Sequence, residues 1–319
     1  MRRVVLRWVA AIAVIALAAA GSVALVVTLG FGPGAFVTSY LDALGRRDAA
    51  SALALPGVAP GDGDRALLTG AALPGLTDIR IVGDVAHDRG VHRVTAAWRS
   101  NGTPGETAFE VARVGTRFGV FPIWAFVHSP VAQLALEVRN SREVTAEDLA
   151  VRTPAVGANV YTVLVPGDYR FVHRDALLSS AEEAVVVDAV GQRFSATVDV
   201  EATPRFVDAA AARVHALLRQ CTTQQVLFPA GCPFGQEIDD RVTSAPVWSI
   251  TREPVIRLVG AGDNANWMIP TSPGTAHLSV RVQSLYDGTT STVDKDVPFT
   301  IRADVRVDAA GGITLSDVR

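Results

Sequence analysis

The sequence has few cysteines, almost no lysine and only one long hydrophobic run. Its 319 residues contain 2 cysteines, too few for a disulfide-dense scaffold or for a structural zinc site of about four ligands. Lys295 is the only lysine, and 29 basic against 32 acidic side chains give a formal net charge of −3. Nucleic-acid binding requires clustered basic residues, so the charge balance argues against a nucleic-acid partner.

Motifs that carry known chemistry are also missing. The sequence has no GxGxxG after a strand, no GxxxxGK[ST], no GxSxG and no HExxH. The 6 histidines are scattered, and the acidic segments at Asp62 to Asp64 and Glu237 to Asp240 lack the ligand spacing of an EF-hand. We therefore predict no catalytic residue, no metal site and no cofactor.

The one long hydrophobic run extends from Trp8 to Leu29 without a charged residue. A helix of that length is about 33 Å long, enough to cross a hydrocarbon core of about 30 Å. Arg2, Arg3 and Arg7 precede it, so the positive-inside rule predicts a cytoplasmic basic stub at residues 1–7, a transmembrane helix at 8–29 and extracytoplasmic domains after it. The alternative is a signal peptide cleaved near Ala18 to Ala20, which also exports the chain.

The two cysteines, Cys221 and Cys232, are close in the sequence. In an oxidising extracytoplasmic space, such a pair is predicted to form one disulfide that pins the loop between them. Two unpaired cysteines in a core are the alternative.

Three modules are predicted after the hydrophobic run. Residues 35–130 begin with an amphipathic helix and continue as strands, and residues 134–203 contain only short strand patterns. Residues 204–319 repeat the order of the first module, with a helix start at Thr203-Pro204 followed by strands that include Val247 to Leu258. Hairpin turns are predicted between strands at three glycine-containing pairs, Asn101-Gly102, Gly115-Thr116 and Asp287-Gly288. A helix followed by an antiparallel sheet predicts an α+β fold class.

A family resemblance supports the same fold class. The segment from Phe36 to Leu53 resembles the opening helix of small NTF2-like (cystatin-like) domains, and Phe118 to Trp124 resembles their closing strand. The resemblance implies two helix-plus-antiparallel-sheet modules that flank a small all-β module. The whole arrangement resembles uncharacterised single-pass envelope proteins of high-GC Gram-positive bacteria, whose modules bind or assemble rather than catalyse.

Two hypotheses of function follow. The first is a non-catalytic, membrane-anchored binding or scaffold protein of the cell envelope, with a protein or peptidoglycan-related partner. The second is a small-molecule-binding or degenerate enzyme domain that uses an apolar pocket between helix and sheet. The aromatic residues that would line such a pocket, unless they fill the cores, are Tyr40, Trp98, Trp124, Trp248 and Trp267.

Overall fold

The computed structural model describes residues 30–118, 121–261, 266–307 and 312–318. Strands make up 51% of it and helices 16%, with three α-helices, so the protein is mostly β. The predicted α+β class with helix-plus-sheet modules was therefore wrong. The prediction followed the order of the elements and not their lengths. Two strands, β16 (Trp267–Gln283) and β17 (Thr290–Val307), have 17 and 18 residues, nearly as many as the 19 of the longest helix.

The first sheet is a four-stranded antiparallel meander that packs against one helix, α2 (Pro33–Gly45). Val37, Tyr40, Leu41 and Leu44 lie on one face of α2 and are buried against the sheet. A short helix, α3 (Ala49–Leu53), follows, with Asp48 as its N-cap. The strands of the sheet are β1 (Leu76–Ala86), β2 (Val91–Ser100), β3 (Thr103–Arg117) and β4 (Phe121–Phe126). Two single 3-10 turns, Gly70–Ala72 and Asp88–Gly90, lie in the connections.

The second part is built from two four-stranded sheets around one core. One sheet has the order β10-β12-β5-β8 and the other β11-β9-β6-β7. Strands β5 and β12 pair in parallel, from Gln133 with Arg193 to Arg139 with Asp199. The strands are β5 (Val131–Arg139), β6 (Glu143–Ala146), β7 (Leu149–Arg152), β8 (Ala158–Leu164), β9 (Gly167–Val172), β10 (Leu178–Ser180), β11 (Glu183–Val187) and β12 (Arg193–Ala202).

The third part has one helix, α4 (Pro204–Thr222), over a six-stranded antiparallel sheet. Strands β16 and β17 form its long central hairpin, and their buried residues alternate with exposed ones, as expected for a sheet with one solvated face. The other strands are β13 (Arg241–Val242), β14 (Val247–Arg252), β15 (Val259–Gly260) and β18 (Ile313–Ser316).

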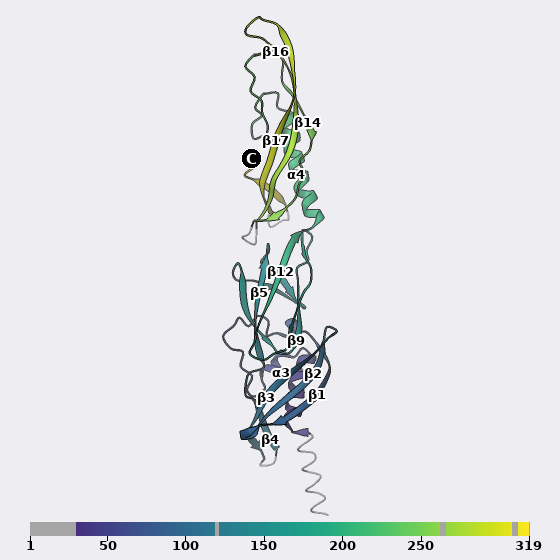
Figure 1. Ribbon diagram of the computed structural model, residues 1–319, viewed down its shortest axis with the longest axis vertical. Coiled ribbons are helices and arrows are strands. Elements are labelled where there is room, and N and C mark those ends of the chain that lie inside the picture. Colours follow the sequence, from purple (N-terminus) through teal and green to yellow (C-terminus); the bar gives the residue numbers. More distant parts are fainter. Residues whose placement is uncertain (1–29, 119–120, 262–265, 308–311, 319) are drawn as a thin grey trace, which may run out of the picture.

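The three parts follow one another along one axis (Figure 1). The first sheet lies at the lower end, the β5 and β9 sheets lie in the middle, and the β16–β17 hairpin reaches the upper end. The hydroxyl of Tyr40 on α2 lies 3.0 and 2.8 Å from the carbonyl oxygens of Pro130 and Val165, which fastens the first part to the second. Thr203 fastens the second to the third, since its amide donates to the carbonyl of Leu177 at 2.8 Å.

Among the residues that the structure describes, no helix is both long enough and apolar enough to cross a membrane. The hydrophobic run at residues 8–29 lies outside the described residues.

Candidate functional site

Helix α4 packs against the sheet of the third part and positions the segment that follows it. The hydroxyl of Thr203 caps the N-terminus of α4 by accepting a hydrogen bond from the amide of Phe206, and Pro204 occupies the first helical position. Phe206, Val214 and Leu218 are buried against the sheet at helical spacing, and Cys221 completes the same face in the last turn. The helix therefore places Cys221 at a fixed position above the sheet.

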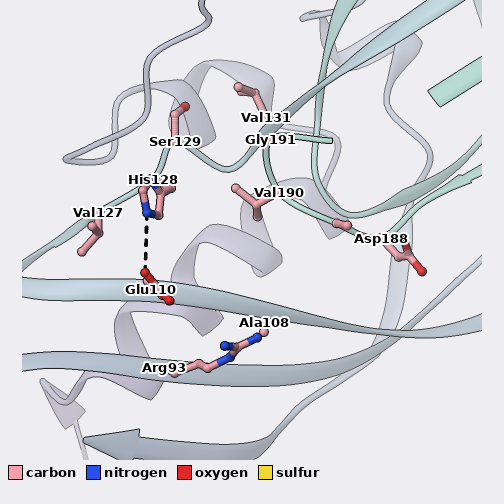
Figure 2. A pocket seen from close by; sticks show the side chains of 11 residues that line it. Arg93, Ala108, Glu110, Val127, His128, Ser129, Val131, Asp188, Val190 and Gly191 are labelled. Atoms are coloured by element: carbon pink, nitrogen blue, oxygen red, sulfur yellow. Dashed lines mark ion pairs between the residues drawn. The ribbon is translucent and has the colours of Figure 1, made fainter. Parts of the chain in front are cut away.

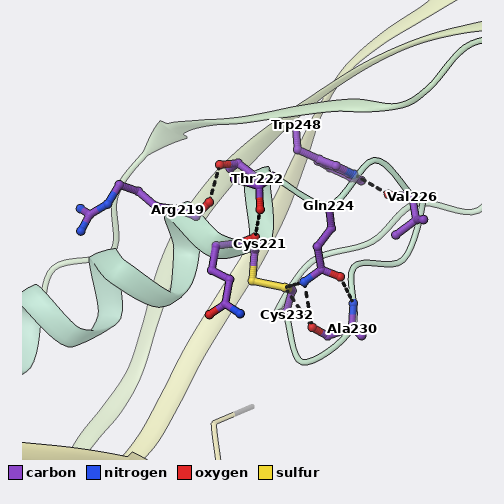
Figure 3. Close-up of a disulfide and its surroundings, with 10 residues drawn as sticks. Arg219, Cys221, Thr222, Gln224, Val226, Ala230, Cys232 and Trp248 are labelled. Atoms are coloured by element: carbon purple, nitrogen blue, oxygen red, sulfur yellow. Dashed lines mark hydrogen bonds between the residues drawn. A yellow bond between two sulfur atoms is a disulfide. The ribbon is translucent and has the colours of Figure 1, made fainter.

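Cys221 and Cys232 form a disulfide, with their Cα atoms 5.7 Å apart (Figure 3). The predicted pair is thereby confirmed. The bond ties the end of α4 to the loop of residues 223–240. The side chain of Gln224 adds a second tie inside this loop, because it accepts the amide of Ala230 and donates to the carbonyl of the same residue.

Two aromatic residues hold the same loop against the sheet. The indole of Trp248 on β14 donates to the carbonyl of Val226 at 2.8 Å. Phe234 is buried, and its ring centroid lies 4.9 Å from that of Trp248 and 5.5 Å from that of Phe299. The loop has no strand or helix of its own, yet both of its halves are attached to the core.

The loop ends beside the turn that joins β16 to β17, which comprises residues 284–289 and is called the tip below. The carboxylate of Asp240 accepts the amide of Leu285 at 3.3 Å. Within the tip, Ser284 and Thr289 are joined through their backbones, and Asp287 accepts both the amide and the hydroxyl of Thr289. These hydrogen bonds hold the pKa of Asp287 below its ordinary value.

The tip is ordered but its apolar side chains are not buried. Tyr286 is 99% exposed and Leu285 is 73% exposed. An isolated exposed leucine is common on protein surfaces, whereas a fully exposed tyrosine next to a leucine on a well-bonded turn offers a preorganised apolar contact. The tip is therefore the candidate functional site.

A charged cluster lies on the same hairpin, farther from the tip. The two ring nitrogens of His277 on β16 face Asp296 at 2.9 Å and Asp294 at 2.7 Å on β17. The hydrogen bonds to Asp296 and Asp294 raise the pKa of His277. Within the described part of the chain, no group of three or more His, Cys, Asp or Glu residues is arranged to hold a metal ion.

A hollow in the surface lies where the first and second parts meet (Figure 2). Its volume is about 700 Å³, and it lies between strands β2 and β3 and the segments at residues 127–131 and 188–191. Arg93, Glu110, His128 and Asp188 give its lining charges of both signs. The Nε2 atom of His128 lies 3.6 Å from the Oε2 atom of Glu110, an exposed contact that contributes little to stability.

The aromatic residues predicted to line a pocket do not share one. Tyr40 is fully buried, with its ring edge-on to Phe109 and Phe126, and Trp248 holds the disulfide loop. Trp98 is buried, and its indole donates to the hydroxyl of Thr107 at 3.0 Å. Trp98, Trp124 and Trp267 each line a different hollow of the surface.

Sequence reasoning missed Phe234, Leu285 and Tyr286. The turn at Asp287-Gly288 was predicted, and it was the signal that could have drawn attention to its two apolar neighbours. Phe234 gave no periodic signal, because it stands alone in a loop.

Comparison with protein-family models, with curated proteins and with solved structures finds no match to this chain.

Proposed function

We propose that the chain is a non-catalytic extracytoplasmic binding protein of the cell envelope, attached to the membrane through residues 8–29, which offers its tip to a protein partner. The observation that carries the proposal is the position of Tyr286. It is 99% exposed on the hydrogen-bonded turn between β16 and β17. Figure 1 shows that this hairpin reaches the end of the molecule opposite to the first sheet. This arrangement holds the tip away from the bilayer.

The chemistry of the tip supports a protein partner. Tyrosine is enriched among the residues that dominate the binding energy of protein interfaces, since it combines a large apolar face with a hydroxyl. The turn is already fixed by Asp240 and Asp287, so little conformational entropy is lost when the tip is bound.

The attached loop supports the same proposal. The disulfide, Trp248 and Phe234 hold residues 223–240 in place, and Asp240 at the end of this loop contacts the tip. An oxidising compartment is required for the disulfide to persist, which agrees with an extracytoplasmic location.

Site-specific photo-cross-linking tests the proposal. p-Benzoylphenylalanine replaces Tyr286 in one strain and Val255, another exposed apolar residue of the same part that is 70% exposed, in another. We expect a discrete protein adduct from position 286 in native membranes and none from position 255. Adding Leu285→Asp should abolish the adduct. Equal adducts at both positions, or none at position 286, would contradict a binding tip.

A second candidate function is favoured by the hollow at the meeting of the first two parts. Its volume of about 700 Å³ and its mixture of Arg93 with Glu110 and Asp188 suit a small zwitterionic ligand. Val190 faces this hollow, so Val190→Trp should fill it. Native mass spectrometry of the purified full chain should then show a bound small molecule that the Val190→Trp variant lacks. Identical spectra without an adduct would eliminate this function.

A further inference from the structure

An apolar surface surrounds the point where the described chain begins. We call Phe31, Phe118, Phe121, Ile123 and Trp124 the basal patch. The ring centroids of Phe31 and Phe121 are 4.7 Å apart, and the indole of Trp124 donates to the carbonyl of Phe31 at 2.8 Å. These contacts fix the segment around Phe31 against β4, and β4 lies at the lower end of the molecule (Figure 1).

The basal patch is exposed although it is apolar. Phe118 is 81% exposed, and Phe31 and Ile123 are also open to solvent. A hollow of about 500 Å³ opens among Phe31, Phe121, Ile123 and Trp124. Among the described residues that line it, Arg117 is the only charged one. The guanidinium of Arg117 lies 5.4 Å from the ring centre of Phe118. Exposed aromatic rings beside an arginine are the composition typical of proteins at a membrane interface.

The position of the patch follows from chain geometry. The hydrophobic run ends at Leu29, and Phe31 follows two residues later. Two residues span at most about 7 Å. The headgroup layer on each side of the hydrocarbon core is about 5–8 Å thick. A chain that leaves the hydrocarbon at Leu29 therefore keeps Phe31, and the rings that contact it, within the headgroup layer.

We propose that the basal patch lies in the headgroup region of the phospholipid bilayer, so that the lower end of the molecule rests on the membrane in addition to being attached to it. This inference rests on the proposed membrane attachment through residues 8–29. Trp124 and Phe118 contact the boundary between headgroups and acyl chains, and Arg117 pairs with lipid phosphates. The contact sets the direction in which the molecule leaves the membrane.

Fluorine NMR on the full chain in phospholipid nanodiscs tests this contact. 4-Fluorophenylalanine replaces Phe118 in one sample and Phe228, an exposed phenylalanine of the third part that is 63% exposed, in a matched control. Nitroxide-labelled headgroups broaden the resonances of nuclei that approach them. We expect the signal at position 118 to be lost when the labelled lipid is present and the signal at position 228 to remain.

The outcomes separate the two proposals. Flotation in a density gradient shows whether the chain is bound to lipid. If the chain floats with lipid and both signals remain, the basal patch does not contact the bilayer and this inference is overturned, while membrane attachment stands. If the chain does not float with lipid, the proposed attachment fails and this inference fails with it. A loss of the Phe118 signal that depends on protein concentration and not on the nitroxide would place a second copy on the patch, which also overturns the inference.

Discussion

At the scale of single residues, tyrosine has two opposite roles in this molecule. Tyr40, Tyr161 and Tyr169 are among the largest fully buried side chains, whereas Tyr286 is almost fully exposed. Burial raises the pKa of Tyr40, so its hydroxyl keeps its proton and remains a donor to backbone carbonyls. Tyr40 thus joins the first two parts of the fold, whereas the hydroxyl of Tyr169 donates to Leu164 within the second part.

The first prediction concerns His277, whose pKa is raised chiefly by its hydrogen bonds to Asp296 and Asp294. A group whose pKa is higher in the folded than in the unfolded protein stabilises the fold when it is protonated. This stabilisation is complete at pH values below the pKa of the unfolded state, which is about 6.5 for histidine. That stabilisation is lost as pH rises through the folded pKa. Titration of the His277 ring signals by NMR should give a pKa above the ordinary histidine value.

Matched variants check the cause. Asp294→Asn and Asp296→Asn should each lower the pKa of His277, and the double variant should bring it to the ordinary range or below. An unchanged titration in the double variant would show that these carboxylates do not hold the imidazolium.

At the scale of elements, the sequence indicated most of the long elements and few of the short ones. The helix start at Thr203-Pro204 and the turn at Asn101-Gly102 were predicted correctly, because a capping threonine and residues that accept a positive φ act locally. The predicted turn at Gly115-Thr116 was wrong, since β3 continues to Arg117. Strands β6, β7 and β10 have three or four residues each and are too short for an alternating pattern to emerge.

The candidate site was less predictable than the elements. The disulfide could be inferred because only two cysteines exist and they lie close together. The contacts of Trp248 with Val226 and Phe234 depend on how a loop folds back over β14, which no local pattern encodes. The parallel pairing of β5 with β12 joins segments that are distant in the chain, so it was not anticipated either.

The second prediction concerns the disulfide. Cys221 and Cys232 are separated by 11 positions, so closing their loop contributes about 2–3 kcal/mol by restricting the unfolded chain. The double variant Cys221→Ala, Cys232→Ala should unfold at a lower urea concentration than the natural chain. Urea unfolding followed by tryptophan fluorescence measures the difference, and reductant should shift the natural chain but not the variant. A natural chain that is insensitive to reductant would contradict the prediction.

At the scale of the whole molecule, the junctions decide whether the three parts behave as one body. The first junction combines the hydroxyl of Tyr40 with a polar network around the buried residue Asp168. In this network Asn101 donates to the backbone carbonyl of Asp168, and Thr103 donates to its carboxylate. The second junction includes Thr203 and Leu178, and Leu178 packs against both the second core and the third.

The third prediction tests the first junction. Tyr40→Phe removes the buried hydroxyl and leaves the carbonyls of Pro130 and Val165 without it, which should cost about 1–3 kcal/mol. Native-state hydrogen exchange of the β5 and β8 amides measures this loss. The control, Tyr286→Phe, removes an exposed hydroxyl and should change stability by no more than about 0.5 kcal/mol. Equal effects of both variants would show that the buried hydroxyl of Tyr40 does not stabilise the junction.

The parallel pairing of β5 and β12 has a consequence for mechanical tension. The chain enters β5 from the first sheet, and it leaves β12 directly into α4 and the third part. If a bound partner pulled the tip while the lower end were held, the two strands would be drawn in opposite directions along their length. Their hydrogen bonds, from Gln133 to Arg139, would then be sheared together and not opened one by one, so this pairing resists stretching of the molecule.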